Sequence, residues 1–273
     1  MNNFRNPWFL GLIILWAAPS AAHAQGGAEE ARYANCMDVA ARAPDKGINL
    51  ALVWQNEGGG IPARHCEALG LFHLQEYGEA AARLEKIATD MRVGKDMPVR
   101  LGKRLVASAG MLADMYGQTA NAWLLADELV RAETAIDTAL SLTENGSSQE
   151  LEMLVDRARI AAADEDFTLA LADLERVIQH DPGRKNILVL LAAAARGTKD
   201  FTKALTALDD YQSIFPRQTA GYLERGNLMD AMGRSKEARK SWLKLLEISD
   251  VGPDADAARA NLERLDVGLS PSQ

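Results

Sequence analysis

The stretch DFTLALADLERVIQHDP, residues 166–182, returns in altered form as DFTKALTALDDYQSIFP, residues 200–216. The two stretches start 34 residues apart and align without a gap. Their identical positions are mostly apolar or helix-terminating: Asp166/Asp200, Phe167/Phe201, Thr168/Thr202, Ala170/Ala204, Leu171/Leu205, Leu174/Leu208 and Pro182/Pro216. A constant apolar skeleton with variable residues between its members indicates a repeated packing unit rather than a duplicated catalytic site.

The sequence around this pair predicts helices throughout. Apolar residues, mainly Ala and Leu, recur at three- and four-residue steps, and Gly or Pro interrupts the segments at short intervals. Sustained alternation of β-branched residues, which would indicate strands, is missing from the sequence. We therefore expect an all-α fold of short antiparallel helical hairpins.

The repeated unit resembles the tetratricopeptide repeat. That family has a small residue in the first helix, an aromatic residue opening the second, then a small and a large apolar residue, and a closing proline. The positions that carry the resemblance are Ala158, Phe167, Ala170, Leu174 and Pro182 in 151–184; Ala192, Phe201, Ala204, Leu208 and Pro216 in 185–218; Gly226, Ala238 and Trp242 in 219–252, with Ser235 in place of the aromatic; Ala120, Leu129, Ala132 and Ile136 in 113–146; and Ala68, Tyr77, Ala80 and Leu84 in 61–94. The resemblance implies an α–α superhelix, because one hairpin cannot bury its own apolar face and neighbours must stack.

The remaining segments fit as ends and joints of this array. We expect an N-terminal helical hairpin over 25–60, about five repeats over 61–252 with those at 151–252 clearest, and a capping helix over 253–266. Asp254 is the expected N-cap of that last helix, and residues 267–273 form a tail. Residues 93–97 are expected to be a loop. The stretch 98–125 is expected to be helical, either as one helix or as two that meet near Gly117.

The first 24 residues have the features of a cleavable export signal. Arg5 gives a basic start, an apolar run follows from Trp8 to Ala18, and Ala22-His23-Ala24 offers small residues at the positions a signal peptidase recognises. The apolar run is short for a membrane span of about 20 residues; an uncleaved anchor is the alternative. We expect cleavage after Ala24, a periplasmic location in a bacterium and no membrane insertion afterwards.

Charge excludes some classes of partner. Without the leader the chain has 29 basic and 38 acidic residues, a net charge of −9. Nucleic-acid affinity comes largely from neutralising phosphates, so nucleic acid is not expected as a partner. Docking on anionic lipid is disfavoured on the same ground of overall charge.

Cys36 and Cys66 are the two cysteines of the sequence. In an oxidising compartment such a pair predicts a disulfide. Cysteines of redox sites are usually close in sequence, as in Cys-x-x-Cys, and these are not. The alternative is a metal site with His65 and His73. We expect the bridge to link the N-terminal hairpin to the array, and we expect no cofactor.

No catalytic motif accompanies the repeats: the sequence has no phosphate-binding glycine loop, no His-Glu-x-x-His and no Gly-x-Ser-x-Gly. The family resemblance implies a non-enzymatic adaptor that binds a peptide or protein segment in a groove lined by first helices. The alternative is a structural subunit of a cell-envelope complex that acts through its outer or terminal surfaces. The register places these residues in the groove: His65, Phe72, His73, Asp114, Asn121, Glu152, Arg159, Asn186, Arg196, Asn227 and Asp230.

Overall fold

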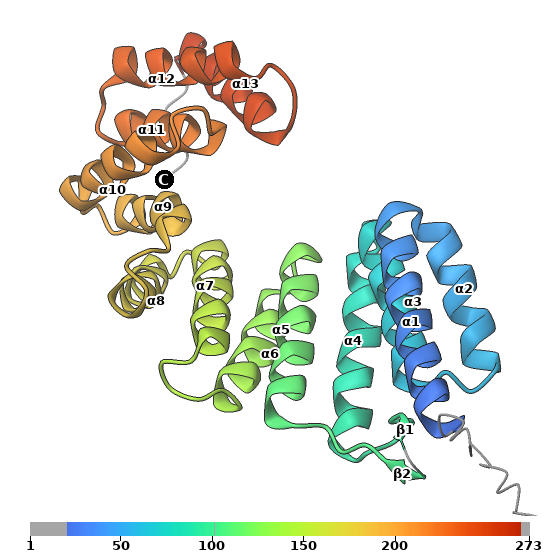
Figure 1. Cartoon of the computed structure of the whole chain (residues 1–273). Coiled ribbons are helices and arrows are strands. Elements are labelled where there is room, and N and C mark those ends of the chain that lie inside the picture. The colour runs from blue at the N-terminus through green and yellow to red at the C-terminus, as the bar shows by residue number, and fades with distance from the viewer. Residues whose placement is uncertain (1–20, 101, 269–273) are drawn as a thin grey trace, which may run out of the picture.

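Helices make up most of the structure, a computed structural model that describes residues 21–100 and 102–268 (Figure 1). The elements in chain order are α1 (Ala21–Arg42), α2 (Pro44–Asn56), α3 (Gly60–His73), α4 (Tyr77–Arg92), β1 (Val99–Arg100), β2 (Lys103–Arg104), α5 (Ala109–Leu125), α6 (Leu129–Ser141), α7 (Ser148–Ala163), α8 (Phe167–His180), the 3₁₀ turn η1 (Lys185–Ile187), α9 (Leu188–Gly197), α10 (Phe201–Ile214), α11 (Thr219–Ala231), α12 (Ser235–Ile248) and α13 (Pro253–Asp266). The expected helical solenoid is confirmed.

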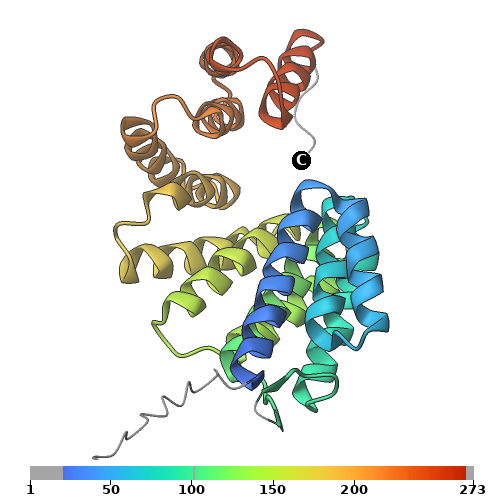
Figure 2. The same cartoon turned by 45° about the vertical axis from the view of Figure 1, so that its right-hand side comes forward.

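The helices stack as hairpins into a curved array. Five hairpins, α3/α4 to α11/α12, follow the five stretches of repeat register, with α1/α2 before them and α13 after them. Each helix packs on its neighbours along the chain, and α5 also meets α7, α9 meets α11 and α11 meets α13. In Figures 1 and 2, α7, α9 and α11 lie on the inside of the bend, and α8, α10 and α12 lie outside.

The apolar skeleton of the repeats forms the core. The small residue near the start of each second helix is fully buried, and the large residue four positions later is at most 4% exposed. These pairs are Ala80/Leu84, Ala132/Ile136, Ala170/Leu174, Ala204/Leu208 and Ala238/Trp242. Burial at one position in every repeat explains why these residue types recur while their neighbours vary.

The turn inside each hairpin has a constant backbone geometry. The residue two positions before each second helix has positive φ, between 62° and 72°: Gln75, Asp127, Glu165, Lys199 and Gly233. Non-glycine residues adopt this left-handed conformation at a cost of about 1–2 kcal/mol. In the two quoted stretches the next residue, Asp166 or Asp200, caps the helix by accepting a hydrogen bond from the amide of Leu169 or Lys203. The repeated aspartate is therefore a helix cap.

A disulfide joins Cys36 on α1 to Cys66 on α3, with Cα atoms 6.0 Å apart. Both cysteines are buried in a small cluster with Trp54 of α2. The bridge therefore holds the first helix against the array, as the sequence predicted.

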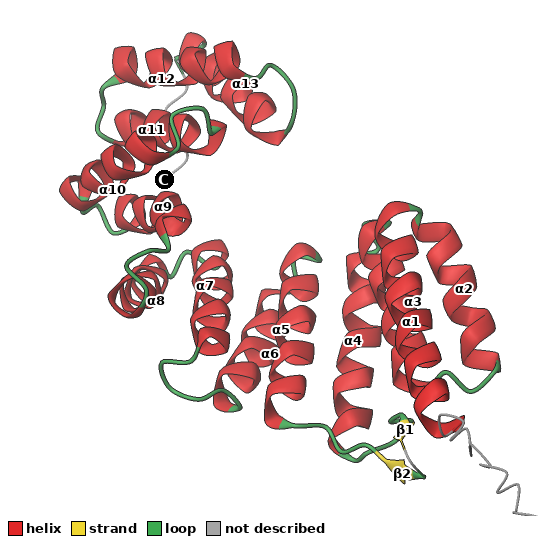
Figure 3. Ribbon diagram, viewed as in Figure 1, coloured by secondary structure: helices red, strands yellow, loops and turns green. Residues whose placement is uncertain are grey.

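The segment 98–108 differs from the expectation of a helix. It forms a two-stranded antiparallel hairpin in which Val99 pairs with Arg104, followed by an extended link (Figure 3). Gly102 has φ +73°, which suits the tight turn and not a helix. Helix α5 then runs unbroken from Ala109 through Gly117 to Leu125.

The last helix begins at a different residue from the one expected, and the first helix begins within the expected leader. The N-cap of α13 is Gly252, not Asp254; Asp254 lies in the first turn and accepts a hydrogen bond from the Thr219 hydroxyl at 2.6 Å. The leader predicted over 1–24 lies outside the described residues up to position 20, and α1 begins at Ala21. No helix of the described ranges has both the length and the apolar character for crossing a membrane.

Candidate functional site

Polar contacts link successive first helices along the predicted groove. Between α5 and α7, the Gln149 amide donates to Asp114 at 2.6 Å and the Asn121 amide donates to Asp156 at 2.8 Å. The partners are 35 residues apart in sequence, close to one repeat. These contacts place Asp114 and Asn121 at the contact of two neighbouring first helices.

The same arrangement joins α11 to α13. Asn261 donates to Asn227 at 3.1 Å, and the Arg264 guanidinium donates to Asp230 at 2.8 Å. Both pairs span 34 residues of sequence. The final helix thus docks as a further first helix would, and it occupies two of the predicted groove residues.

An ion pair in the middle of the array ties α9 to α11. Arg196 donates to Glu224 at 2.6 and 3.3 Å, and Glu224 is buried. Burial raises the pKa of the Glu224 carboxyl, and the hydrogen bond and charge of Arg196 oppose that rise. Removing one partner of a buried pair leaves the other charge uncompensated, so Arg196 stabilises the contact between α9 and α11.

A smaller set of predicted groove residues is exposed. Glu152 and Arg159 project from α7, where Glu152 pairs with Arg184 and Arg159 donates to Asp156 at 2.7 Å. Burial raises the pKa of the Asp156 carboxyl, which Asn121 and Arg159 partly counter. The exposed members of the set are His73, Asp114, Glu152, Arg159 and Asn186.

Two predicted groove residues at the N-terminal end lie elsewhere. His65 is 8% exposed: its Nε2 donates to Gln118 at 2.7 Å, and its Nδ1 accepts from the Tyr33 hydroxyl at 2.6 Å. Phe72 is half-buried against the core and packs edge-on against Tyr77. The assignment of His65 to the groove surface is therefore wrong, because α1 covers the face of α3 that the repeat register leaves open.

The burial of His65 predicts a pH-dependent stability. Desolvation lowers its pKa below the ordinary 6.5, so the unfolded chain binds the proton more readily than the folded one. The contribution of neutral His65 is present above pH 6.5 and is lost as pH falls through the folded-state pKa. We expect urea unfolding to show a steeper loss of stability from pH 7.5 to 5.0 in the wild type than in His65→Gln. His73→Gln, at an exposed position, should keep the wild-type slope; equal slopes for all three proteins would contradict the assignment.

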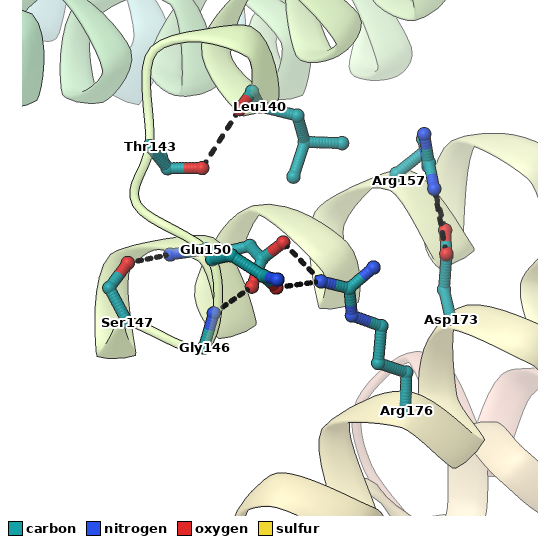
Figure 4. A network of polar contacts seen from close by, with 9 residues as sticks. Leu140, Thr143, Gly146, Ser147, Glu150, Arg157, Asp173 and Arg176 are labelled. Carbon is teal, nitrogen blue, oxygen red and sulfur yellow. Dashed lines mark hydrogen bonds and ion pairs between the residues drawn. The ribbon is translucent and has the colours of Figure 1, made fainter.

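A polar network between α7 and α8 was not foreseen from the sequence (Figure 4). Ser147 caps α7, and Glu150 accepts from the Gly146 amide at 2.6 Å and from Arg176 at 2.6 Å. Ser147 and Glu150 have the Ser-x-x-Glu spacing that is typical of a helix N-terminus, and this spacing could have predicted the contact.

About two turns further along α7, Arg157 makes two 2.8 Å hydrogen bonds to the buried Asp173. Asp173 holds the pKa of Arg157 above its usual range, ahead of the opposing effect of burial. Glu150 and Asp173 therefore use their charges to hold α7 and α8 together, and Arg157 also pairs with Asp137 of α6 at 3.3 Å.

The metal site considered as the alternative to the disulfide is not formed by the described residues. Across the ranges the structure describes, no group of three or more His, Cys, Asp or Glu side chains is placed to hold a metal ion. The alternative metal site would need the sulfur atoms of Cys36 and Cys66 as ligands beside His65 and His73, and these two sulfur atoms are joined in the disulfide.

Comparisons with known proteins agree with the architecture. Residues 161–224 match the family model of the tetratricopeptide repeat. No match was found among curated protein sequences. PilW, a widely conserved type IV pilus biogenesis factor, is 14% identical with a TM-score of 0.60 over 88% of this chain and 98% of its own.

Two other solved structures share the fold. A tetratricopeptide repeat protein from Parabacteroides merdae is 12% identical, with a TM-score of 0.59 over 89% of this chain and 88% of its own. MamA from Desulfovibrio magneticus is 17% identical, with a TM-score of 0.51 over 72% of this chain and 94% of its own. At these identities the likeness concerns the fold.

Proposed function

The chain carries tetratricopeptide repeats, matched by sequence over residues 161–224 and by fold over most of its length, and we propose that it is a non-enzymatic adaptor. Its ligand is a peptide or a segment of a partner protein, bound on the surface of the first helices. The observation that carries this proposal is the row of exposed polar residues on the first helices α3, α5 and α7 and on η1 before α9, with no catalytic motif in the sequence beside it.

The surface formed by α7 and by η1, the turn that precedes α9, is the best-supported centre of this site. Glu152, Arg159 and Asn186 are exposed there, and they offer one anionic, one cationic and one amide group. A mixed set of this kind suits an extended polar segment, whose backbone amides and side chains need both donors and acceptors. A bound partner would displace the ion pairs that Glu152 and Arg159 make with Arg184 and Asp156. Each such surface pair contributes at most about 1 kcal/mol, so displacing it costs little.

The periplasm is the proposed location. The leader expected over 1–24 provides the route, and the buried disulfide suits an oxidising compartment. The fold likeness to PilW, a pilus biogenesis factor, is compatible with a role in the cell envelope.

Charge reversal on the exposed set tests the proposal. We expect a Glu152→Arg, Arg159→Glu, Asn186→Glu variant to bind its partner at least about tenfold more weakly, a loss of ~1.4 kcal/mol. The measurement is a pull-down from periplasmic extract with the wild-type chain as bait, followed by titration of the captured protein against each variant. Arg196 is left intact because its loss would leave the buried Glu224 without its ion-pair partner and destabilise the α9–α11 contact.

A control variant reverses one acidic and one basic residue on second helices: Asp210→Arg on α10 and Lys240→Glu on α12, both exposed. It should bind like the wild type. If every captured partner binds the first-helix variant as tightly as the wild type, the groove assignment fails.

The structural-subunit alternative has one observation in its favour. Helix α2, at the N-terminal end of the array, exposes Leu50, Leu52 and Val53. A terminal hairpin is expected to be polar on its outer side, so exposed apolar residues there suit an assembly contact. Capture that survives the first-helix variant and is lost on Leu50→Ser with Val53→Ser would favour this role.

A further inference from the structure

The segment between α4 and α5 is an insertion into the array. Residues 93–108 separate these helices, whereas residues 215–218 suffice between α10 and α11. The array does not need this length, because hairpins elsewhere stack with short connections.

The insertion is fixed to the body of the protein. Met97 is buried in the main core, and Leu105 packs partly against it. The Ile61 amide donates to the Asp96 carbonyl at 2.9 Å, and the Leu105 amide donates to the Pro98 carbonyl at 2.8 Å. These contacts hold β1 and β2 in a defined position (Figure 3).

Its outer surface combines apolar and cationic groups. Val93, Val99 and Val106 are 75%, 61% and 86% exposed. Val99 lies directly opposite Arg104, so the two share one face of the hairpin. Val106 follows Arg104 by two residues, with Leu105 turned to the core between them.

The local charge is opposite to that of the chain. The stretch RVGKDMPVRLGKR, residues 92–104, has five basic residues and one acidic residue, a charge of +4 in a protein of net charge −8. The acidic residue, Asp96, is 3.5 Å from Arg64 of α3. Arg92, Lys95, Lys103 and Arg104 are exposed.

The hairpin of β1 and β2 lies at one end of the molecule. In both views the start of α1 lies at the same end of the molecule as β1 and β2 (Figures 1 and 2). The hairpin lies away from α7 and α9 in Figure 1, so a surface bound by this face would not cover the proposed partner site.

We propose that this basic hairpin docks the protein on an anionic phospholipid surface. Cations near such a surface and apolar side chains at the headgroup boundary are the two groups that peripheral docking uses. Strands of two residues are short for adding a strand from a partner protein, and a projecting turn offers no groove to a peptide. Docking by this face leaves α7 and α9 available for a partner.

Vesicle sedimentation tests the proposal on the full chain. The wild type is expected to partition into phosphatidylcholine–phosphatidylglycerol vesicles more strongly than into phosphatidylcholine alone, with the excess lost at high salt. Lys103→Gln with Arg104→Gln should lower the partition into anionic vesicles about thirty-fold, as ~1 kcal/mol for each cation requires. Val99→Ser with Val106→Ser should weaken binding to both kinds of vesicle.

The control is Lys236→Gln with Lys240→Gln, which removes two exposed cations from α12 and should bind like the wild type. All variants keep residues 8–18, so any binding by that apolar run is common to them. Equal binding of the wild type to both vesicles, or an equal loss in the α12 control, would overturn the proposal. Capture of an acidic protein that depends on Lys103 and Arg104, without an anionic-vesicle excess, would overturn it in favour of a protein partner.

Discussion

Replacing Trp242 by alanine is expected to lower the free energy of unfolding by about 3–5 kcal/mol, the range for removing a large buried aromatic side chain. Trp242 of α12 is fully buried in a core cluster that also contains Met229 of α11, Leu245 of α12 and Ala258 of α13. Its indole lies against Gly226: a Cβ added at that glycine would come within 2.1 Å of the ring nitrogen. The indole therefore packs directly on the α11 backbone at Gly226, and its removal would leave a cavity there.

The loss of stability caused by Trp242→Ala should first affect the helices around residue 242. In a repeat array each unit contacts only its neighbours, so α11 to α13 should open before the rest. Amide hydrogen exchange read by mass spectrometry should show faster exchange in 219–266 than in 151–184. Leu243→Ala, an exposed neighbour on the same helix, should change stability by less than about 0.5 kcal/mol. A Trp242→Ala protein with wild-type stability would show that this residue does not hold the end of the array.

Removing the disulfide is expected to cost roughly 3–4 kcal/mol, as the chain-entropy model gives for a closed loop of about 30 residues. Cys36→Ala with Cys66→Ala avoids placing a polar group in the buried cluster around Trp54. Without the bridge, α1 is held to α3 by packing and by the Tyr33–His65 hydrogen bond. Urea unfolding followed by circular dichroism gives the difference.

Reductant supplies the matched control. Reduced wild type should lose about as much stability as the double variant, and the double variant should not respond to reductant. Thiol counting on the unreduced wild type should give none. Two titratable thiols on the unreduced protein would contradict the bridge.

The sequence alone was sufficient for the register of the hairpins. The positions of Phe167 and Phe201, Ala170 and Ala204, and Leu174 and Leu208 repeat because the same burial is required in every unit. Packing of this kind depends on residues within one repeat and its neighbour, so a single 34-residue period predicts it. The disulfide followed from cysteine number and helix order.

The groove was less predictable, because exposure depends on what covers a helix. Repeat register places His65 on an open face, but α1 lies outside the register and covers it. Arg196 and Glu224 are far apart in the sequence, and their pairing is fixed only when α9 and α11 stack. The register therefore indicates which helices carry the site, and the stacked structure decides which side chains remain free.

In the hairpin at 99–104, too, the sequence predicts some properties and the tertiary structure decides the others. Its sequence carries the charge and the valines, which are local facts. Two-residue strands have little stability of their own, so this conformation exists because Met97 and the Ile61 amide hold it against the core. The sequence by itself determined the repeating helical skeleton, because the packing that defines it recurs with a fixed period. Only the tertiary structure decided which charges are paired, which are buried and which project, because those outcomes depend on contacts between distant parts of the chain.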